Sequence, residues 1–255
     1  MDLGLDGAKA LVFGSSSGLG MAVAAGLSAE GAEVVVTGRD RARIDAAVER
    51  VGARGGLAGD LTEPGAGTRL IAETVAVLGG LDICIVNTGG GMPGPIMATD
   101  GADDSAYHSM LRPALEIARA AAPHLRRGGR GRLLFLTARS VVEASPELAL
   151  SSVMRSGVAA ASRSLALELA PEVLVNTVIT GQFDTPALGR FEAALAASSG
   201  LGMNDIRAEH ESSIPLGRLG TAEEFANVVV FLASARSTFV TGSTIRVDGG
   251  AVRGF

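Results

Sequence analysis

The sequence predicts an α/β fold in which a doubly wound parallel sheet of about seven strands is covered by helices on both faces. Two observations support this prediction. Short apolar stretches alternate with longer amphipathic stretches along the whole 255-residue chain, as in strands joined by right-handed helical crossovers. The first apolar stretch ends in a serine- and glycine-rich loop that opens directly into a helix. We expect a single domain over residues 1–255, because no linker-like segment interrupts the alternation.

The expected elements follow from hydrophobic periodicity and from the turn residues between them. Thr221 and Glu224 have the spacing of a capping box, which predicts a helix that runs to Ser234. Residues 186–213, rich in Ala, Ser and Gly, are expected to form a mobile helical pair that covers a substrate, although two surface helices without a ligand fit equally well. The seven strands are expected at 8–13, 34–37, 57–61, 81–86, 133–137, 173–179 and 245–247. The remaining helices are expected at 21–30, 40–50, 63–78, 102–127 and 146–170.

The loop after the first strand has the chemistry of a phosphate cradle. Gly14 permits a tight turn, Gly18 lets the backbone approach a pyrophosphate, and Gly20 allows the helix to pack closely on the strand. The spacing is G-x-x-x-G-x-G, and a plain glycine-rich turn is the alternative interpretation. The position between a strand and a helix favours the nucleotide cradle.

Composition excludes several other classes of protein. The net charge of -5 does not suit a nucleic-acid-binding surface. The single cysteine, Cys84, lies in an apolar strand and suits a reducing compartment. The three histidines are too far apart in sequence for a paired metal motif. We see neither a signal peptide nor a run long enough to cross a bilayer, so we expect a cytoplasmic protein without membrane or nucleic-acid partners.

The ends of the next strands carry the side chains that would choose a cofactor. An acidic residue after the second strand binds a ribose 2′-hydroxyl, whereas an arginine accommodates a 2′-phosphate. Arg39 follows this strand and favours NADP(H) over NAD(H), although a solvated arginine at the start of a charged helix is the plainer alternative. Asp60 follows the third strand, where it could meet an adenine edge.

Several motifs in the expected order make the chain resemble a short-chain dehydrogenase/reductase of the classical type, with a Rossmann-type fold, over nearly its whole length. Residues 87–90, Asn-Thr-Gly-Gly, stand for the family's Asn-Asn-Ala-Gly. Departures are Thr180, where proline is usual, and Phe183, where a smaller apolar residue is common. The matching motifs are Gly14-Ser15-Ser16-Ser17-Gly18-Leu19-Gly20, Asp60-Leu61, Asn87-Thr88-Gly89-Gly90, Val175-Asn176 with Gly181 and Thr185, Ile214 to Gly220, and Thr241 to Gly250.

The resemblance implies a cofactor site and an oligomer. Asp60 is expected at the adenine, Asn87 and Gly89 on the adenosine side, and Thr185 at the nicotinamide carboxamide. Pairing through the 146–170 helix and the last strand implies a homotetramer or homodimer. The full set expected to bind NADP(H) is Gly14, Ser16, Ser17, Gly18, Leu19, Gly20, Arg39, Asp60, Leu61, Asn87, Gly89, Gly181 and Thr185.

The family's catalytic residues are replaced in this chain. Its reductases use Tyr-x-x-x-Lys, a serine thirteen residues before the tyrosine, and an asparagine on the preceding helix. The only tyrosine and the only lysine here are Tyr107 and Lys9, which cannot form that dyad. Alignment with the family's motifs puts Ser151 at the tyrosine position and Arg155 at the lysine position, and Ala138 and Met110 at the other two. The chain thereby resembles a divergent branch that is similar to 3-oxoacyl-ACP reductases.

This replacement leaves three interpretations of the function. A serine hydroxyl is a much weaker acid than a tyrosine, and an arginine keeps its proton and supplies only charge and donors. Ser151, Arg155 and Ser140 are the candidate catalytic residues. We favour an NADP(H)-dependent oxidoreductase with an altered proton path, acting on a carbonyl or hydroxyl group of a small molecule or acyl substrate. A non-redox enzyme (cyclase, isomerase or dehydratase) and a non-catalytic dinucleotide-binding partner are the alternatives.

Overall fold

A seven-stranded, all-parallel sheet forms the centre of the computed structural model, which describes residues 2–143 and 145–253. The strand order is β3-β2-β1-β4-β5-β6-β7, so the chain crosses from one side of β1 to the other between β3 and β4. Ligands of such sheets bind at the carboxyl ends of the strands beside this reversal. The strands are β1 (Lys9–Val12), β2 (Glu33–Gly38), β3 (Gly55–Ala58), β4 (Ile83–Val86), β5 (Gly131–Ala138), β6 (Val173–Thr180) and β7 (Thr244–Val247). The predicted fold class is confirmed.

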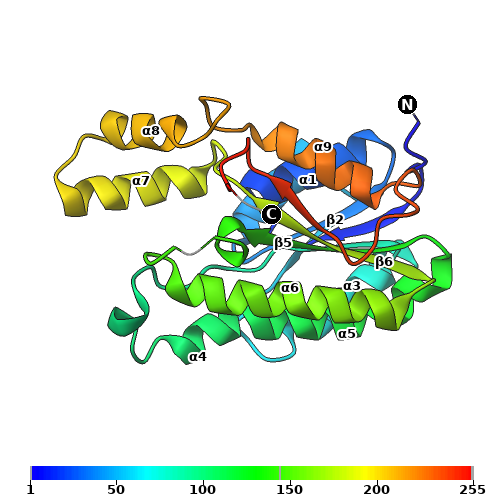
Figure 1. Cartoon of the computed structure of the whole chain (residues 1–255). Coiled ribbons are helices and arrows are strands. Elements are labelled where there is room, and N and C mark those ends of the chain that lie inside the picture. The colour runs from blue at the N-terminus through cyan, green and yellow to red at the C-terminus, as the bar shows by residue number, and fades with distance from the viewer. Residues whose placement is uncertain (1, 144, 254–255) are drawn as a thin grey trace.

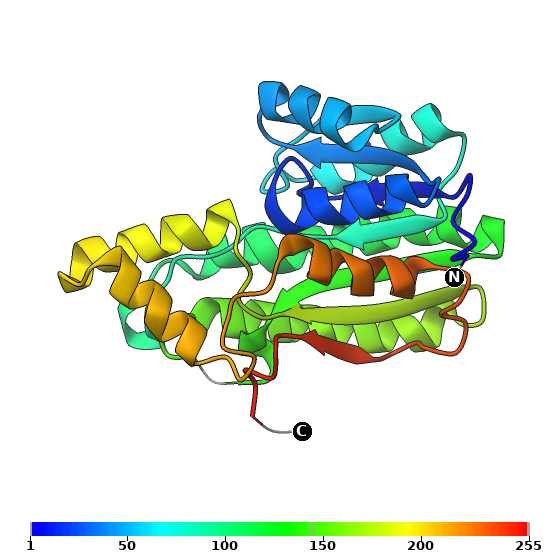
Figure 2. The same cartoon turned by 90° about the horizontal axis from the view of Figure 1, so that it is seen from above.

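Helices cover both faces of the sheet (Figure 1). Helices α1, α2 and α9 pack on one face, and α3, α5 and α6 on the other. Figure 2 shows α7 and α8 projecting beyond the carboxyl ends of the strands. The helices are α1 (Gly18–Ala29), α2 (Arg41–Val51), α3 (Ala66–Leu78), α4 (Asp103–Ala106), α5 (Arg112–Leu125), α6 (Ala149–Leu169), α7 (Pro186–Ser199), α8 (Met203–Ser212) and α9 (Ala222–Ala233).

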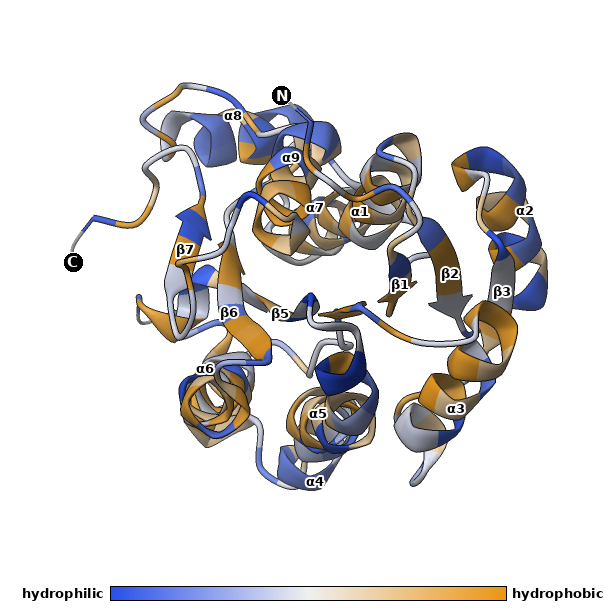
Figure 3. Ribbon diagram, turned by 90° about the vertical axis from the view of Figure 1, so that its right-hand side faces the viewer, coloured by the Kyte–Doolittle hydropathy of each residue, from blue (hydrophilic) through white to orange (hydrophobic). Residues whose placement is uncertain are grey.

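The core consists of two apolar layers, one on each face of the sheet. Figure 3 shows hydrophobic strands between helices whose apolar sides face inward. Phe13 and Phe135 anchor the layer under α3, α5 and α6, and Phe225 anchors the layer under α1 and α9. Cys84 is fully buried in β4, as expected for a core residue, and its burial raises the pKa of the thiol. Among the described residues, none of the helices has the length and apolarity that crossing a membrane requires.

The third strand was predicted at 57–61, and this prediction is wrong by two to three residues. Strand β3 is Gly55–Ala58, with Gly55 opposite Val35 and Ala58 opposite Gly38 of β2. Glycine disfavours a strand by its own propensity, but here Gly56 lies directly beneath Ile44 and Val48 of α2, where a Cβ would collide with both side chains. The close approach of α2 therefore selects glycine.

The single helix predicted over 102–127 is also wrong. Helix α4 is followed by a π-helical segment, Tyr107–Leu111, before α5 begins. Pro113 lacks an N–H and cannot donate to the carbonyl of Ser109 in an α-helical pattern, so the hydrogen-bond ladder must change there.

Three helix starts are displaced by three residues, whereas the helices after β6 match their predictions. Helix α1 starts three residues earlier than predicted, and α3 and α6 start three residues later. For α3, the N-cap residue Gly65 has a φ of 82°, outside the range of a right-handed helix, so the helix begins after it. Helices α7 and α8 form the predicted pair, and the Thr221–Glu224 capping box at the start of α9 is confirmed.

Candidate functional site

The loop between β1 and α1 has the geometry expected of a phosphate cradle. Gly14 and Gly18 have φ of 60° and 56°, a region that glycine adopts without steric cost. A Cβ on Gly20 would collide with the carbonyl of Gly14, so Gly20 permits the close contact between α1 and the loop. The Ser15 hydroxyl donates to Val12 O (2.6 Å) and accepts from the Thr37 N–H (2.9 Å), which fixes the loop on β2.

A cavity of about 570 Å³, which we call the nucleotide cavity, begins at this loop and follows the carboxyl ends of β2 and β4. It passes beside the turn after β3 and reaches the segment after β4, which is where a doubly wound sheet binds its ligand. Most of the predicted cofactor residues line it. Its lining is Gly14, Ser16, Ser17, Thr37, Gly38, Arg39, Asp40, Arg43, Gly59, Asp60, Leu61, Thr62, Asn87, Thr88, Gly89, Gly90, Ser109 and Arg190.

The end of β2 offers the cation Arg39 and no acid at Thr37 or Gly38, and the carboxylate of the next residue, Asp40, accepts from the Arg43 N–H (2.9 Å). Gly38 lies against Ser16, so that a Cβ there would be 2.8 Å from the Ser16 Oγ. Arg39 follows and is exposed to the cavity. On the far side, hydrogen bonds from the Thr62 N–H and hydroxyl hold the pKa of Asp60 below its usual value, with a smaller contribution from the charge of Arg39. Asp60 is therefore ionised and accepts hydrogen bonds.

Side-chain hydrogen bonds fix the loops around the cavity. Asn87 Nδ2 donates to the carbonyl of Gly14 (3.2 Å), which joins the end of β4 to the phosphate cradle. The Ser109 hydroxyl donates to Gly90 O (3.0 Å). Arg112 Nη2 donates to Thr62 O (2.6 Å) and so fixes the turn after β3. The cavity is thus held in shape by its own side chains.

Ser151 and Arg155 lie one turn apart on α6 and are hydrogen-bonded to each other. Arg155 Nε donates to Ser151 Oγ over 3.2 Å. Its two terminal nitrogens donate to Leu136 O of β5 (3.4 Å) and to Gly89 O (3.0 Å). Burial lowers the pKa of this guanidinium, but an arginine stays protonated in proteins. No carboxylate among the described residues pairs with it, so a positive charge is held between the segment after β4, β5 and α6.

The other candidate catalytic positions lie close to this pair in the fold. Ala138 is the last residue of β5. Ser140 follows in a single turn, with 4% of its surface exposed and no hydrogen-bond partner for its hydroxyl within the described ranges. Met110 is fully buried against Ala106 and Leu150. Tyr107, the only tyrosine, lies in the π-helical segment and is 39% exposed, facing a separate hollow with Arg112.

The residues after β6 have structural contacts of their own. Thr185 caps α7 by accepting from the Leu188 N–H (3.3 Å), and its methyl group lies near Gly18. A Cβ on Gly181 would meet the backbone of Asp248 at 2.5 Å, so this glycine serves the packing of the C-terminal segment and does not line the nucleotide cavity. The Thr180 hydroxyl donates to Thr137 O (3.0 Å), a bond that the usual proline could not make.

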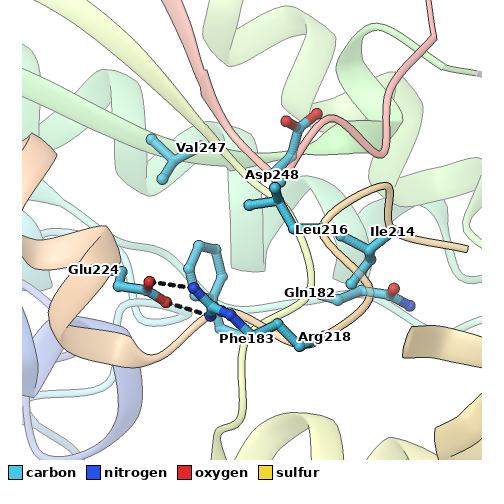
Figure 4. Close-up of a pocket in the computed structure, with 10 residues that line it drawn as sticks. Gln182, Phe183, Ile214, Leu216, Arg218, Glu224, Val247 and Asp248 are labelled. Atoms are coloured by element: carbon cyan, nitrogen blue, oxygen red, sulfur yellow. Dashed lines mark hydrogen bonds and ion pairs between the residues drawn. The ribbon is translucent and has the colours of Figure 1, made fainter. Parts of the chain in front are cut away.

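Phe183 points into the core beside a second, smaller cavity. The ring of Phe183 contacts Phe225 with centroids 5.3 Å apart, and a Cβ on Gly220 would lie 2.5 Å from it. Figure 4 shows this cavity of about 190 Å³, with the bidentate pair of Arg218 and Glu224 on one side and Asp248 on the other. The larger side chain at 183 is thus accommodated by glycine at 220.

Sequence reasoning missed two arginines of the nucleotide cavity. Arg43 lies in the first turn of α2, four residues after Arg39, and a second arginine so soon after the end of β2 was a signal that could have been used. Arg190 lies in α7, five residues after Thr185, and reaches the cavity only because α7 packs beside the phosphate cradle. No local pattern in the sequence indicates that contact.

The fold and this site define a member of the short-chain dehydrogenase/reductase family. A family model described as enoyl-(acyl carrier protein) reductase matches residues 14–252. The chain is 30% identical to the short-chain dehydrogenase/reductase SDRA of Arabidopsis thaliana, over 96% of this chain and 95% of that protein. It is 33% identical to an uncharacterised oxidoreductase of Mycobacterium tuberculosis, over 96% and 92%. The chain therefore belongs to this family of oxidoreductases.

A solved structure with high similarity is the L-sorbose reductase of Gluconobacter frateurii in complex with NADPH and L-sorbose. Its TM-score is 0.93 at 29% sequence identity, and the alignment covers 100% of both chains. A dehydrogenase/reductase from Sinorhizobium meliloti matches with a TM-score of 0.85 at 30% identity, over 98% of this chain and 97% of that one. Both confirm the predicted family and fold.

Proposed function

We propose that this protein is an NADP(H)-dependent oxidoreductase that interconverts a carbonyl and a hydroxyl group on a small-molecule or acyl substrate. The observation that carries the proposal is the 3.2 Å hydrogen bond from Arg155 Nε to Ser151 Oγ at the carboxyl end of the sheet. It supplies an activated hydroxyl at the position that the family's tyrosine would occupy.

The residues present fit the adenosine and phosphate half of NADP(H). The cradle of Gly14 and Gly18 would hold a pyrophosphate, and Arg39 with Ser16 would hold a 2′-phosphate. The absence of an acid at Gly38 agrees with this choice. The L-sorbose reductase that shares the fold binds NADPH, which supports the same cofactor here. When bound, the nicotinamide supplies or accepts a hydride.

Ser151 has the hydrogen-bond arrangement of a donor to a substrate oxygen. Because its Oγ accepts the N–H of Arg155, its own proton is free to point at a carbonyl oxygen. The guanidinium charge polarises the hydroxyl and stabilises negative charge that develops on that oxygen. The buried hydroxyl of Ser140, which has no hydrogen-bond partner within residues 2–143 and 145–253, is the candidate for a second donor.

The hydroxyl of the Ser151–Arg155 pair is a weaker acid than the hydroxyl of a tyrosine–lysine dyad. A serine titrates far above the pKa of about 10 of a tyrosine, so we expect Ser151 to act mainly as a hydrogen-bond donor with slow proton transfer. The two backbone carbonyls that hold Arg155 keep the guanidinium in place. This arrangement suits a carbonyl that is already activated, such as a diketone.

A non-redox enzyme on the same scaffold, or a binding protein without catalysis, is the alternative, because Ala138 and Met110 supply no polar group at two positions where the family has one. A hydride-transfer screen separates these possibilities. NADPH deuterated on one face of the nicotinamide is incubated with a panel of ketones, diketones and acyl thioesters, and deuterium in the product is measured. Stereospecific transfer supports the proposal; tight NADPH binding with no transfer to any member contradicts it.

We also propose that the chain forms a homo-oligomer through α6 and β7. Leu167 and Val153 on α6 are 85% and 57% exposed, and contact with a second copy would remove this apolar surface from water. Ala160, exposed on the same helix, would let a second helix approach closely, whereas Gly157 packs against Leu111 of its own chain. Strand β7 is an edge strand of the sheet and could pair with or pack beside its copy.

A further inference from the structure

Three arginines from separate segments line one end of the nucleotide cavity. Arg39 follows β2, Arg43 lies in the first turn of α2, and Arg190 lies in α7. Arg39 and Arg43 are only four residues apart in the sequence. Arg190 comes from the helical pair that projects beyond the carboxyl ends of the strands (Figure 2), so its presence here is a tertiary contact.

The side chains of Arg43 and Arg190 have no anionic partner in the part of the chain that the structure describes. Within residues 2–143 and 145–253, neither guanidinium makes a hydrogen bond or an ion pair, although both are exposed. Other exposed arginines of this chain do find carboxylates. Pairs of this kind are Arg41–Asp45, Arg69–Glu73 and Arg218–Glu224. Asp40 and Asp60 also line the cavity, but their carboxylates already accept from backbone N–H groups. Three cations against these two acids leave a positive balance that favours an anion.

The position of the arginines relative to Ser16 indicates which anion they would bind. Arg43 and Arg190 also line an adjacent groove of about 680 Å³, and Ser16 and Ser17 line both hollows. These four residues therefore lie at the boundary between the two hollows. Ser16 is the residue whose Oγ lies against Gly38, at the end of β2. This is the ribose 2′ end of the cavity.

The buried carboxylate of Glu192 on α7 contacts two residues of α8. Glu192 of α7 is 2% exposed and contacts the Nδ1 of His210 at 3.0 Å and the Nε of Arg207 at 3.6 Å. Arg207 also pairs with Asp184, next to Thr185. Both partners of Glu192 lie on α8, so the two helices are held together as one unit. An anion that holds Arg190 would therefore also restrain α8.

We propose that Arg190 is a 2′-phosphate-binding residue supplied by the covering helices, and that with Arg39 and Arg43 it forms a three-arginine clamp. This inference rests on the proposed NADP(H) specificity. It adds a consequence: binding of the 2′-phosphate orders α7 and α8. NADPH therefore brings these two helices over the cavity, whereas NADH leaves them mobile. Arg190 is then a determinant of both cofactor choice and closure.

Calorimetry with two fragments tests the contact without any turnover. The probes are adenosine 2′,5′-bisphosphate and adenosine 5′-monophosphate, titrated into the full chain. We expect Arg190→Ala to weaken binding of the bisphosphate about 10-fold, the effect of losing about 1.4 kcal/mol, with the monophosphate changed by less than twofold. Arg190→Lys should recover part of the loss. Arg50→Ala is the matched control, because Arg50 lines the adjacent groove and not the nucleotide cavity.

Hydrogen exchange measures the closure separately. The bisphosphate should slow exchange of the α7 and α8 amides in the wild type, and this protection should be absent in Arg190→Ala. Unchanged affinity and protection in Arg190→Ala, or equal weakening for both probes, would overturn the inference while leaving NADP(H) specificity intact. A wild type that binds the two probes equally would overturn NADP(H) specificity itself, and this inference with it.

Discussion

Arg155 Nε donates a hydrogen bond to Ser151 Oγ across one turn of α6. An i,i+4 pair on a helix normally contributes only a few tenths of a kcal/mol to stability, so its position matters more than its strength. Arg155 also donates to the Gly89 carbonyl, which joins α6 to the segment at the end of the nucleotide cavity. The pair therefore connects the candidate hydroxyl donor to the cofactor site.

Restoring the family's residues should accelerate carbonyl reduction. The triple variant Ser151→Tyr, Arg155→Lys and Ala138→Ser introduces an acid of ordinary pKa near 10 beside an ammonium group, and general acid catalysis contributes typically about 10²–10⁴-fold. Single-turnover oxidation of NADPH with an activated diketone measures the gain. A folded triple variant that binds NADPH and reduces no faster than the wild type would show that the substrate pocket itself has diverged.

Removing Arg39 should abolish the preference for the phosphorylated cofactor. A charge-assisted contact contributes about 1.5–3 kcal/mol, so Arg39→Ala should bind NADPH at least about 10-fold more weakly, with NADH little changed. Fluorescence titration of both cofactors measures this. Equal affinities of the wild type for NADPH and NADH would contradict the role of Arg39.

The capping box of α9 should make part of the stability depend on pH in the acid range. Hydrogen bonds from Arg218, and next from the Thr221 N–H, lower the pKa of Glu224 from 4.5 to about 2. Because the folded pKa lies below the unfolded one, this contribution is complete above pH 4.5 and is lost as the pH falls toward 2. In urea unfolding, the difference between wild type and Glu224→Gln should shrink over this interval.

The control for that experiment is Glu223→Gln, one residue earlier in the same helical turn. This variant removes a charge from the same turn and leaves the ion pair of Arg218 with Glu224 in place. A Glu224→Gln variant whose difference from the wild type is constant over the same interval would contradict the assigned pKa.

An added charge on the exposed face of α6 should dissociate the proposed oligomer. Leu167→Glu places a carboxylate where an apolar side chain is 85% exposed, and burying it against a second copy would be costly. Light scattering at micromolar concentration should give a smaller mass for this variant than for the wild type. Val77→Glu on α3, whose side chain is 47% exposed, is the control, and a monomeric wild type would refute the proposal.

The alternation of strands and helices and the Gly14–Gly20 cradle were predictable, because they depend on local periodicity and backbone conformation. Strand β3 was displaced in the prediction because Gly56 is explained only by the side chain of Ile44 above it. Likewise, the contribution of Arg190 to the nucleotide cavity depends on how α7 docks. Features set by contacts between distant segments leave no local pattern in the sequence.

In the candidate site, too, some features were predictable from the sequence and others depend on contacts between distant segments. Counting residues within motifs predicts which residues stand at the family's catalytic positions, but it does not predict their hydrogen bonds. Nothing in the spacing of Ser151 and Arg155 indicates that the guanidinium also binds the Gly89 and Leu136 carbonyls. The orphaned hydroxyl of Ser140 is likewise visible only once β5 and α6 are packed together.

The most direct test of the central claim is the rate of a single turnover with Ser151→Ala. Deuterated NADPH and an activated diketone are mixed with the variant, and NADPH oxidation and product deuterium are followed together. Loss of one donor to the developing oxyanion should lower the rate of hydride transfer about 10²-fold, with NADPH affinity unchanged. We expect a normal rate for the control Ser152→Ala, whose hydroxyl donates to Leu148 O. A Ser151→Ala variant that transfers hydride as fast as the wild type would contradict the account.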